Sequence, residues 1–183
     1  MHTKDLMSTR LVPSVLTAGA LVGLLVALPG CEPAPVEGKQ VGNLCPEIAG
    51  QDVNGNVIRL SELRGKAVLV NFWATWCGPC RQMIPHEREM VARKYKDRPF
   101  VLLGVAQNDP EEVKEFQKVT PMPWPNIVDG NRVLGKQWSV DSIPAAILVD
   151  HNGVIRERWR NGLSPDEVWA AVDKAVRKAE DSK

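Results

Sequence analysis

The sequence predicts an α/β domain in which a mixed central sheet carries helices on both faces. Two apolar runs, at 67–73 and 100–106, are typical of strands that are buried on both sides by flanking helices. Turn signals and helix-start signals alternate with these runs, and the resulting order is a β-hairpin, then βαβα, then ββα. At 183 residues the chain is long enough for one such domain and short for two.

Two Asn-Gly pairs predict the hairpins of this order. Asn54-Gly55 lies between short strand-like stretches, so a small hairpin should precede the first buried strand. Asn152-Gly153 should turn the strand expected at 145–149 back into a second strand.

The helix-start signals are equally local. Segments 109–112 and 164–167 each offer an N-cap residue, a proline at the first helical position and a glutamate at the third, which is the capping-box pattern. Another helix is expected after Cys80, where apolar residues recur at helical spacing and Pro85 introduces a kink. Alternating prolines at 120–126 predict a loop.

Composition excludes some classes of protein. Charged residues make up 25% of the chain and apolar ones 44%, which is ordinary for a soluble globular domain. The formal net charge of +1 favours neither a nucleic-acid surface nor a strongly acidic partner, so no nucleic-acid binding is expected.

The N-terminus predicts export. Lys4 and Arg10 precede an uncharged apolar run at 11–28, and Leu28-Pro-Gly-Cys31 closes it. This pattern resembles a bacterial lipoprotein signal, in which the cysteine is lipidated and becomes the new N-terminus. An uncleaved membrane helix and a different cleavage site are the alternatives.

These features predict three segments. Residues 1–30 would be a signal peptide with a lipobox, 31–44 a semi-extended tether rich in proline and glycine, and 45–183 the α/β domain. The domain would be exported to the periplasmic side of a bacterial cell envelope and anchored to the membrane through Cys31.

The chemistry-bearing motif is Cys77-Gly78-Pro79-Cys80, between the first buried strand and a helix. Two cysteines three positions apart on the first helical turn can form a reversible disulfide. Free backbone N–H groups and the helix dipole stabilise a thiolate at Cys77, which is therefore the expected nucleophile. Gly78 leaves it uncrowded, Pro79 suits the first turn, and Cys80 should be more buried and attack second.

An inert structural disulfide and half of a zinc site are the alternatives. A zinc site needs about four ligands, and the sequence has no second paired-cysteine motif, so neither a metal nor another cofactor is expected. Without Cys31 the chain keeps three cysteines, of which Cys45 is either a small buried hydrophobe or an additional redox thiol.

The stretch Phe72-Trp-Ala-Thr-Trp-Cys-Gly-Pro-Cys80 resembles the active-site signature of the thioredoxin superfamily. More narrowly, residues 41–178 resemble its exported, membrane-tethered TlpA/ResA-like branch, with matching segments at 52–55, 60–66 and 150–153. The resemblance implies a thioredoxin-like three-layer sandwich with an added N-terminal β-hairpin.

The same resemblance implies a function. The protein would be a thiol-disulfide oxidoreductase that reduces disulfides in protein substrates and is itself reduced by a trans-membrane thiol reductant. Haem-binding cysteines of apocytochromes, and thus cytochrome c-type biogenesis, are the family-level expectation. A redoxin-type thiol peroxidase is one alternative, although Thr75 lies two residues before Cys77 where peroxidases have three. A non-catalytic binding module with this fold is another.

The resemblance also assigns supporting roles. It implies that Pro144 is cis and packs opposite the cysteines, and that Ile143 hydrogen-bonds the substrate backbone; a trans proline at a strand junction is the alternative. Trp76 would border the site and contact partner proteins, unless it is simply packed.

Two positions depart from the family pattern. Asn71 stands where many thioredoxins have a buried aspartate, and Met83 where many exported members have a glutamate. Either carboxylate would take the proton of Cys80, so the sequence leaves the base for Cys80 unidentified.

Overall fold

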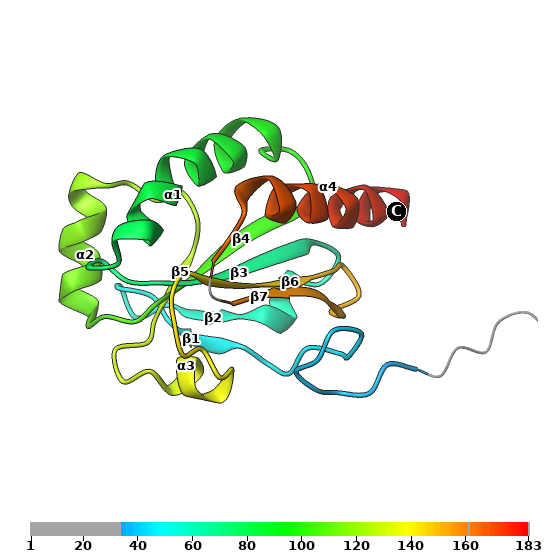
Figure 1. Ribbon diagram of the computed structural model, residues 1–183, viewed down its shortest axis with the longest axis horizontal. Coiled ribbons are helices and arrows are strands. Elements are labelled where there is room, and N and C mark those ends of the chain that lie inside the picture. The colour runs from blue at the N-terminus through cyan, green and yellow to red at the C-terminus, as the bar shows by residue number, and fades with distance from the viewer. Residues whose placement is uncertain (1–33, 161, 183) are drawn as a thin grey trace, which may run out of the picture. The chain divides into compact units, whose positions relative to one another are not determined.

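The computed structural model describes residues 34–160 and 162–182. Its centre is a five-stranded sheet in the order β5-β4-β3-β6-β7, with bounds Ala67–Trp73 (β3), Phe100–Ala106 (β4), Asn126–Val128 (β5), Ala145–Val149 (β6) and Ile155–Trp159 (β7). The β3-β4 and β4-β5 pairs are parallel, whereas β6 is antiparallel to both of its neighbours. The predicted mixed sheet is confirmed (Figure 1).

Helices cover both faces of this sheet. Their bounds are Gly78–Glu89 (α1, followed by a π-helical turn, Met90–Lys94), Pro110–Val119 (α2), Val133–Gln137 (α3) and Pro165–Asp181 (α4). Side chains of α1 and α4 pack on one face, and α3 packs on the other together with the hairpin Ala49–Gln51 (β1) and Val57–Arg59 (β2). Figure 1 shows these layers, and the thioredoxin-like three-layer fold with an added hairpin is confirmed.

The central strand β3 positions the site. It is buried along its whole length, as expected of a strand between two helical layers. Side chains alternate between the two faces of a strand, so Leu69 and Asn71 point to the layer of α1 and α4, whereas Val70 points to that of α3. Asn71 therefore lies beneath α1.

The segment predicted to be a tether differs from expectation. Its described part lies along β7, where Gly42 N–H donates to Ile155 O at 2.8 Å and Ile155 N–H donates to Asn43 O at 2.9 Å. An edge strand presents unpaired backbone groups, which explains why this segment is held there. Residues 1–33, including the predicted signal and Cys31, lie outside the described residues.

A half-buried arginine completes this attachment. The Arg158 guanidinium donates hydrogen bonds to the backbone carbonyls of Lys39 and Trp138, and it lies over the Trp138 ring at 5.6 Å from the ring centroid. The segment 37–44 is thus joined both to β7 and, through Arg158, to the end of α3.

The predicted helix starts are correct, but their caps are not. α2 and α4 begin at Pro110 and Pro165, yet neither Asp109 nor Ser164 makes a side-chain cap hydrogen bond. At α2 the carboxylate of Glu112 accepts a hydrogen bond from Asn108 Nδ2 at 2.8 Å instead. Within the described ranges, no helix is long and apolar enough to cross a membrane.

Candidate active site

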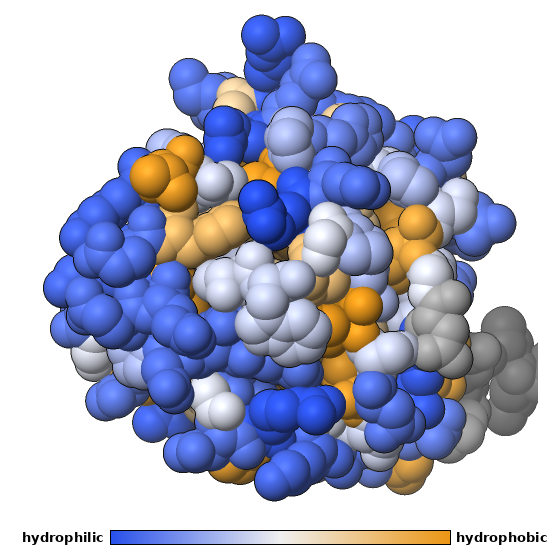
Figure 2. All heavy atoms as spheres, turned by 60° about the vertical axis from the view of Figure 1, so that its left-hand side comes forward, coloured by the Kyte–Doolittle hydropathy of each residue, from blue (hydrophilic) through white to orange (hydrophobic). Residues whose placement is uncertain are grey.

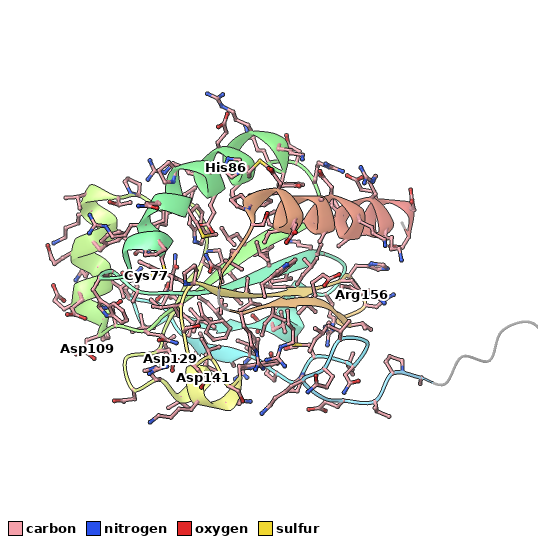
Figure 3. All side chains as sticks on the ribbon, in the orientation of Figure 1. Cys77, His86, Asp109, Asp129, Asp141 and Arg156 are labelled. Atoms are coloured by element: carbon pink, nitrogen blue, oxygen red, sulfur yellow. A yellow bond between two sulfur atoms is a disulfide. The ribbon has the colours of Figure 1, made fainter. Side chains whose placement is uncertain are left out.

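Cys77 and Cys80 lie at the junction between β3 and α1. Cys77 occupies the N-cap of α1, and its Sγ accepts a hydrogen bond from Cys80 N–H at 3.2 Å. The two sulfur atoms form a disulfide, with the Cα atoms 5.3 Å apart. Cys77 is 4% exposed and Cys80 2%, so the expected difference in burial is small while the disulfide is intact. Figure 3 places Cys77 at the start of α1.

The rim beside the disulfide is open and apolar. Gly78 and Pro79 form the exposed first turn of α1, and Trp76 is 68% exposed. Figure 2 shows apolar patches in a mostly hydrophilic surface on the side where α1 begins and α2 lies. An exposed tryptophan next to a reactive disulfide provides a contact for an incoming protein.

A groove adjoins this rim between α1 and α4. Its volume is ≈ 820 Å³, and its lining includes Pro79 and Met83 from α1, Ile143 and Pro144 before β6, and Trp169 from α4. The Ile143–Pro144 peptide bond is cis, as the resemblance implied. Ile143 also packs against the hydrophobic cluster that contains both cysteines. The fold thus brings residues 77–80 and 143–144 to one place.

The loop between β3 and α1 is held by a residue that sequence reasoning missed. Buried Asn108 accepts a hydrogen bond from Thr75 N–H at 2.8 Å and donates to Thr75 Oγ1 at 3.0 Å. Its position after β4 was the available signal, because the carboxyl ends of parallel strands meet at one edge of a sheet. Trp73 supports the same loop from the core, where its Nε1–H donates to Asn126 Oδ1 at 3.0 Å.

Glu87 is the second residue that sequence reasoning missed. It is only 2% exposed, lines the groove, and accepts a hydrogen bond from Asn71 Nδ2 at 2.8 Å. Burial raises the pKa of Glu87 to about 7, against the opposing effect of the Asn71 hydrogen bond. The sequence carried a signal, because Cys80, Ile84 and Glu87 have the i, i+4, i+7 spacing of one helix face. Asn71 is thus the hydrogen-bond donor to a buried acid and is not the acid itself.

Cys45, the third cysteine of the domain, lies away from the disulfide. Cys45 is a free, buried thiol in the hydrophobic cluster on the α3 side of the sheet, and burial raises its pKa to about 12. His86 is exposed on α1, with its ring edge-on to Trp169 at 5.8 Å between centroids. In the part of the chain that the structure describes, no group of three His, Cys, Asp or Glu side chains could hold a metal ion.

The chain is similar to known proteins in sequence and in fold. Residues 41–158 match the model of the AhpC/TSA family. The chain is 33% identical over 127 residues to the thiol-disulfide oxidoreductase ResA of Bacillus cereus, covering 68% of this chain and 72% of the relative. It is 31% identical to ResA of Geobacillus kaustophilus, covering 70% and 74%. Among solved structures, the thioredoxin domain of a Bacteroides vulgatus thiol-disulfide oxidoreductase superposes with a TM-score of 0.65 at 29% identity, covering 75% of this chain and 98% of that one.

Proposed function

Because the chain belongs to the AhpC/TSA family and is a thioredoxin-like thiol-disulfide oxidoreductase of the ResA type, we propose that it reduces disulfides in other proteins through Cys77 and Cys80. The observation that carries the proposal is the disulfide at the start of α1, beside a groove bordered by cis Pro144. An exposed, apolar rim and an adjoining groove suit an extended protein segment better than a small thiol.

The reaction proceeds in two exchanges. In the reduced enzyme the Cys77 thiolate attacks a substrate disulfide, a Cys77–substrate disulfide forms, and one substrate thiolate leaves. Cys80 then attacks the Cys77 sulfur, the Cys77–Cys80 disulfide forms, and the second substrate thiolate leaves with the electron pair. The hydrogen bond from Cys80 N–H to Cys77 Sγ supports Cys77 as the first thiolate.

The direction of electron flow follows from the residues between the cysteines. Gly78 and Pro79 are the pair found in thioredoxin, whose potential is about −270 mV. We expect a value near this one when the protein is equilibrated with reduced and oxidised glutathione. A potential near that of the strong oxidant DsbA, about −120 mV, would reverse the direction proposed.

The proposed location is the periplasmic side of the cell envelope, with a lipid anchor on Cys31. The charged N-terminus, the apolar run at 11–28 and the closing cysteine support it. Disulfides persist in exported compartments, so a low-potential dithiol there needs electrons from a trans-membrane thiol reductant. Apocytochrome haem-binding cysteines are the substrate class that the resemblance makes the first to test.

Trapping tests the proposed order of attack. A Cys80→Ser variant should accumulate mixed disulfides between Cys77 and its protein substrates, because the second attack is blocked. The adducts are separated without reductant and identified by mass spectrometry, in a Cys45→Ala background that removes the remaining thiol of the domain. Cys77→Ser is the matched control and should trap nothing. Adducts that form through Cys80 instead would contradict the order.

Two rival functions have their own measurements. A thiol peroxidase would consume peroxide through Cys77 in the Cys80→Ser variant, and we expect no such consumption. A non-catalytic binding module would leave the cellular phenotype intact when Cys77→Ser replaces the wild-type protein, whereas we expect the phenotype of a deletion.

A further inference from the structure

Glu87 and Asn71 form a buried polar pair, and their mutual hydrogen bond leaves one polar atom of the pair without a partner among the described residues. Asn71 Nδ2 donates to Glu87 Oε1, while the buried Asn71 Oδ1 has no hydrogen-bond partner among the described residues. An unpaired buried acceptor lowers the stability of the fold unless a water molecule donates a hydrogen bond to it. Glu87 lines the groove beside the site, so water in the groove lies next to the Glu87 side chain of this pair.

Cys80 lies on the same helix face as Glu87. The two residues are seven positions apart on α1, which is about two turns or 10 Å along the helix axis. Helical side chains lean toward the N-terminus, and this carries the Glu87 carboxyl group back toward Cys80. Asn71 approaches the same region from β3, two residues before the end of that strand.

We propose that Glu87 accepts the proton of Cys80 through one water molecule held by Asn71 Oδ1, and so serves as the base for the second thiol exchange. The inference rests on the proposed function, in which Cys80 attacks second. It also relocates the base, because the carboxylate absent from positions 71 and 83 is supplied from position 87.

The second exchange moves one proton and one electron pair. As Cys80 attacks the mixed disulfide, the Cys80–Cys77 bond forms and the Cys77–substrate bond breaks. The electron pair leaves on the substrate sulfur, and the Cys80 proton passes through the water to the Glu87 carboxylate. When a reductant cleaves the Cys77–Cys80 disulfide, Glu87 returns the proton to Cys80.

The surroundings suit this exchange. Burial raises the pKa of Glu87 to about 7, so the carboxyl group can take and return a proton near neutral pH. The other titratable groups that line the groove are His86 on α1 and Asp166 on α4. β3 and β6 contribute no titratable side chain. A substitution at Glu87 alone therefore leaves the other charges of the groove in place.

A chromogenic aromatic disulfide separates the two exchanges in one stopped-flow experiment. The full-length protein carries Cys31→Ala and Cys45→Ala, so that Cys77 and Cys80 are its only thiols. In the reduced protein, attack by Cys77 releases the first coloured thiolate, and attack by Cys80 on the mixed disulfide releases the second. The first phase reports Cys77 and the second reports Cys80.

Glu87→Gln should slow the second phase by roughly 100-fold near neutral pH and leave the first within about twofold. The parent's second phase should rise with pH through about 7, the pKa of Glu87. That of the variant should rise only as an ordinary thiol ionises, near pH 8.5. Glu89→Gln, an exposed substitution on the same helix, is the matched control and should change neither phase.

Exchanging the two groups provides a rescue. Asn71→Asp combined with Glu87→Gln keeps a hydrogen-bonded acid–amide pair with the acid on β3, and it should restore most of the second-phase rate. If Glu87→Gln alone does not fold, the second-phase rate of this double variant still tests whether the acid of this pair is the base for Cys80. A second phase that Glu87→Gln leaves unchanged, or that the double variant fails to restore, would overturn the assignment of the base. A parent protein without a first phase would overturn the proposed function itself.

Discussion

The ionisation of Glu87 ties the stability of the fold to pH. Burial raises its pKa from 4.5 to about 7. Between these values the folded protein holds a proton that the unfolded chain has released, so the free energy of unfolding decreases as pH rises. The stabilisation is fully present below about pH 4.5 and is lost as pH rises through about 7.

Glu87→Gln should remove this dependence. The shift corresponds to about 3 kcal/mol, so above pH 7 the variant should be more stable than the wild type by up to that amount. Urea unfolding of the oxidised proteins at about pH 5 and about pH 8 measures the difference. Glu89→Gln should follow the wild type, because Glu89 is exposed in its pair with Arg93. Parallel pH profiles for the wild type and Glu87→Gln would contradict the prediction.

Cys45 should be chemically silent in the folded protein. Its thiol is 4% exposed and burial raises its pKa to about 12, so very little thiolate forms at neutral pH. In reduced Cys31→Ala protein, brief treatment with iodoacetamide should modify Cys77 and leave Cys45 unmodified until the chain is denatured. Peptide mass spectrometry measures this, and rapid modification of native Cys45 would favour the redox-thiol alternative.

Among the elements, β7 and the segment at 37–44 depend on one another. Arg158 links them, because it rises from β7 and donates to the carbonyls of Lys39 and Trp138. Arg158→Met keeps the length of the side chain and removes both hydrogen bonds. We expect a loss of about 1 kcal/mol, because both hydrogen bonds are only partly buried.

Hydrogen exchange provides the specific readout for this variant. The amides of Gly42 and Cys45 donate to Ile155 and Gly153, so both should exchange faster in Arg158→Met than in the wild type. Lys39→Ala is the control, since it removes only the exposed hydrogen bond to Gln137 O and should change stability by less than about 0.5 kcal/mol. Unchanged exchange in Arg158→Met would mean that the backbone pairing alone holds the segment.

Elements with local signals were predictable, and those that depend on distant partners were not. The strands at 67–73 and 100–106 have the predicted bounds, because one apolar run begins after Lys66 and the other lies between Pro99 and Gln107. The pairing of 37–44 with β7 joins residues more than 100 positions apart, and no local pattern encodes it. At α2 the predicted capping box does not form, and Glu112 there has a competing partner in Asn108, which only the folded chain brings near.

The site shows the same division. Cys77 and Cys80 were predictable because a closely spaced cysteine pair at a strand–helix junction carries the chemistry itself, whereas cis Pro144 was implied by the family resemblance. Glu87 could not be predicted from position 71, because an asparagine there shows only that the usual aspartate is absent. The role of Asn71 depends on Glu87, which accepts its hydrogen bond from a different element. The local signal for Glu87 is a charged residue at an apolar position of the helix.

For the whole molecule, the anchor decides where the dithiol works. Removal of 1–30 would take two basic residues from 23 and one acidic residue from 22, leaving 21 of each. A formally neutral chain has no electrostatic attraction to an anionic membrane surface, so the lipid on Cys31 would have to hold it there.

Labelling with radioactive palmitate tests this anchor. The wild type should incorporate label, run at the mass of a chain that begins at Cys31, and stay with the membrane after alkaline extraction. Cys31→Ala should incorporate none and keep the mass of the unprocessed chain, whereas Cys45→Ala should behave as the wild type. A wild-type protein that is unlabelled yet membrane-bound would instead mean that the apolar run at 11–28 stays as an uncleaved membrane helix. Both outcomes tether the domain, but only lipidation frees the chain from the hydrophobic run before it meets its substrates.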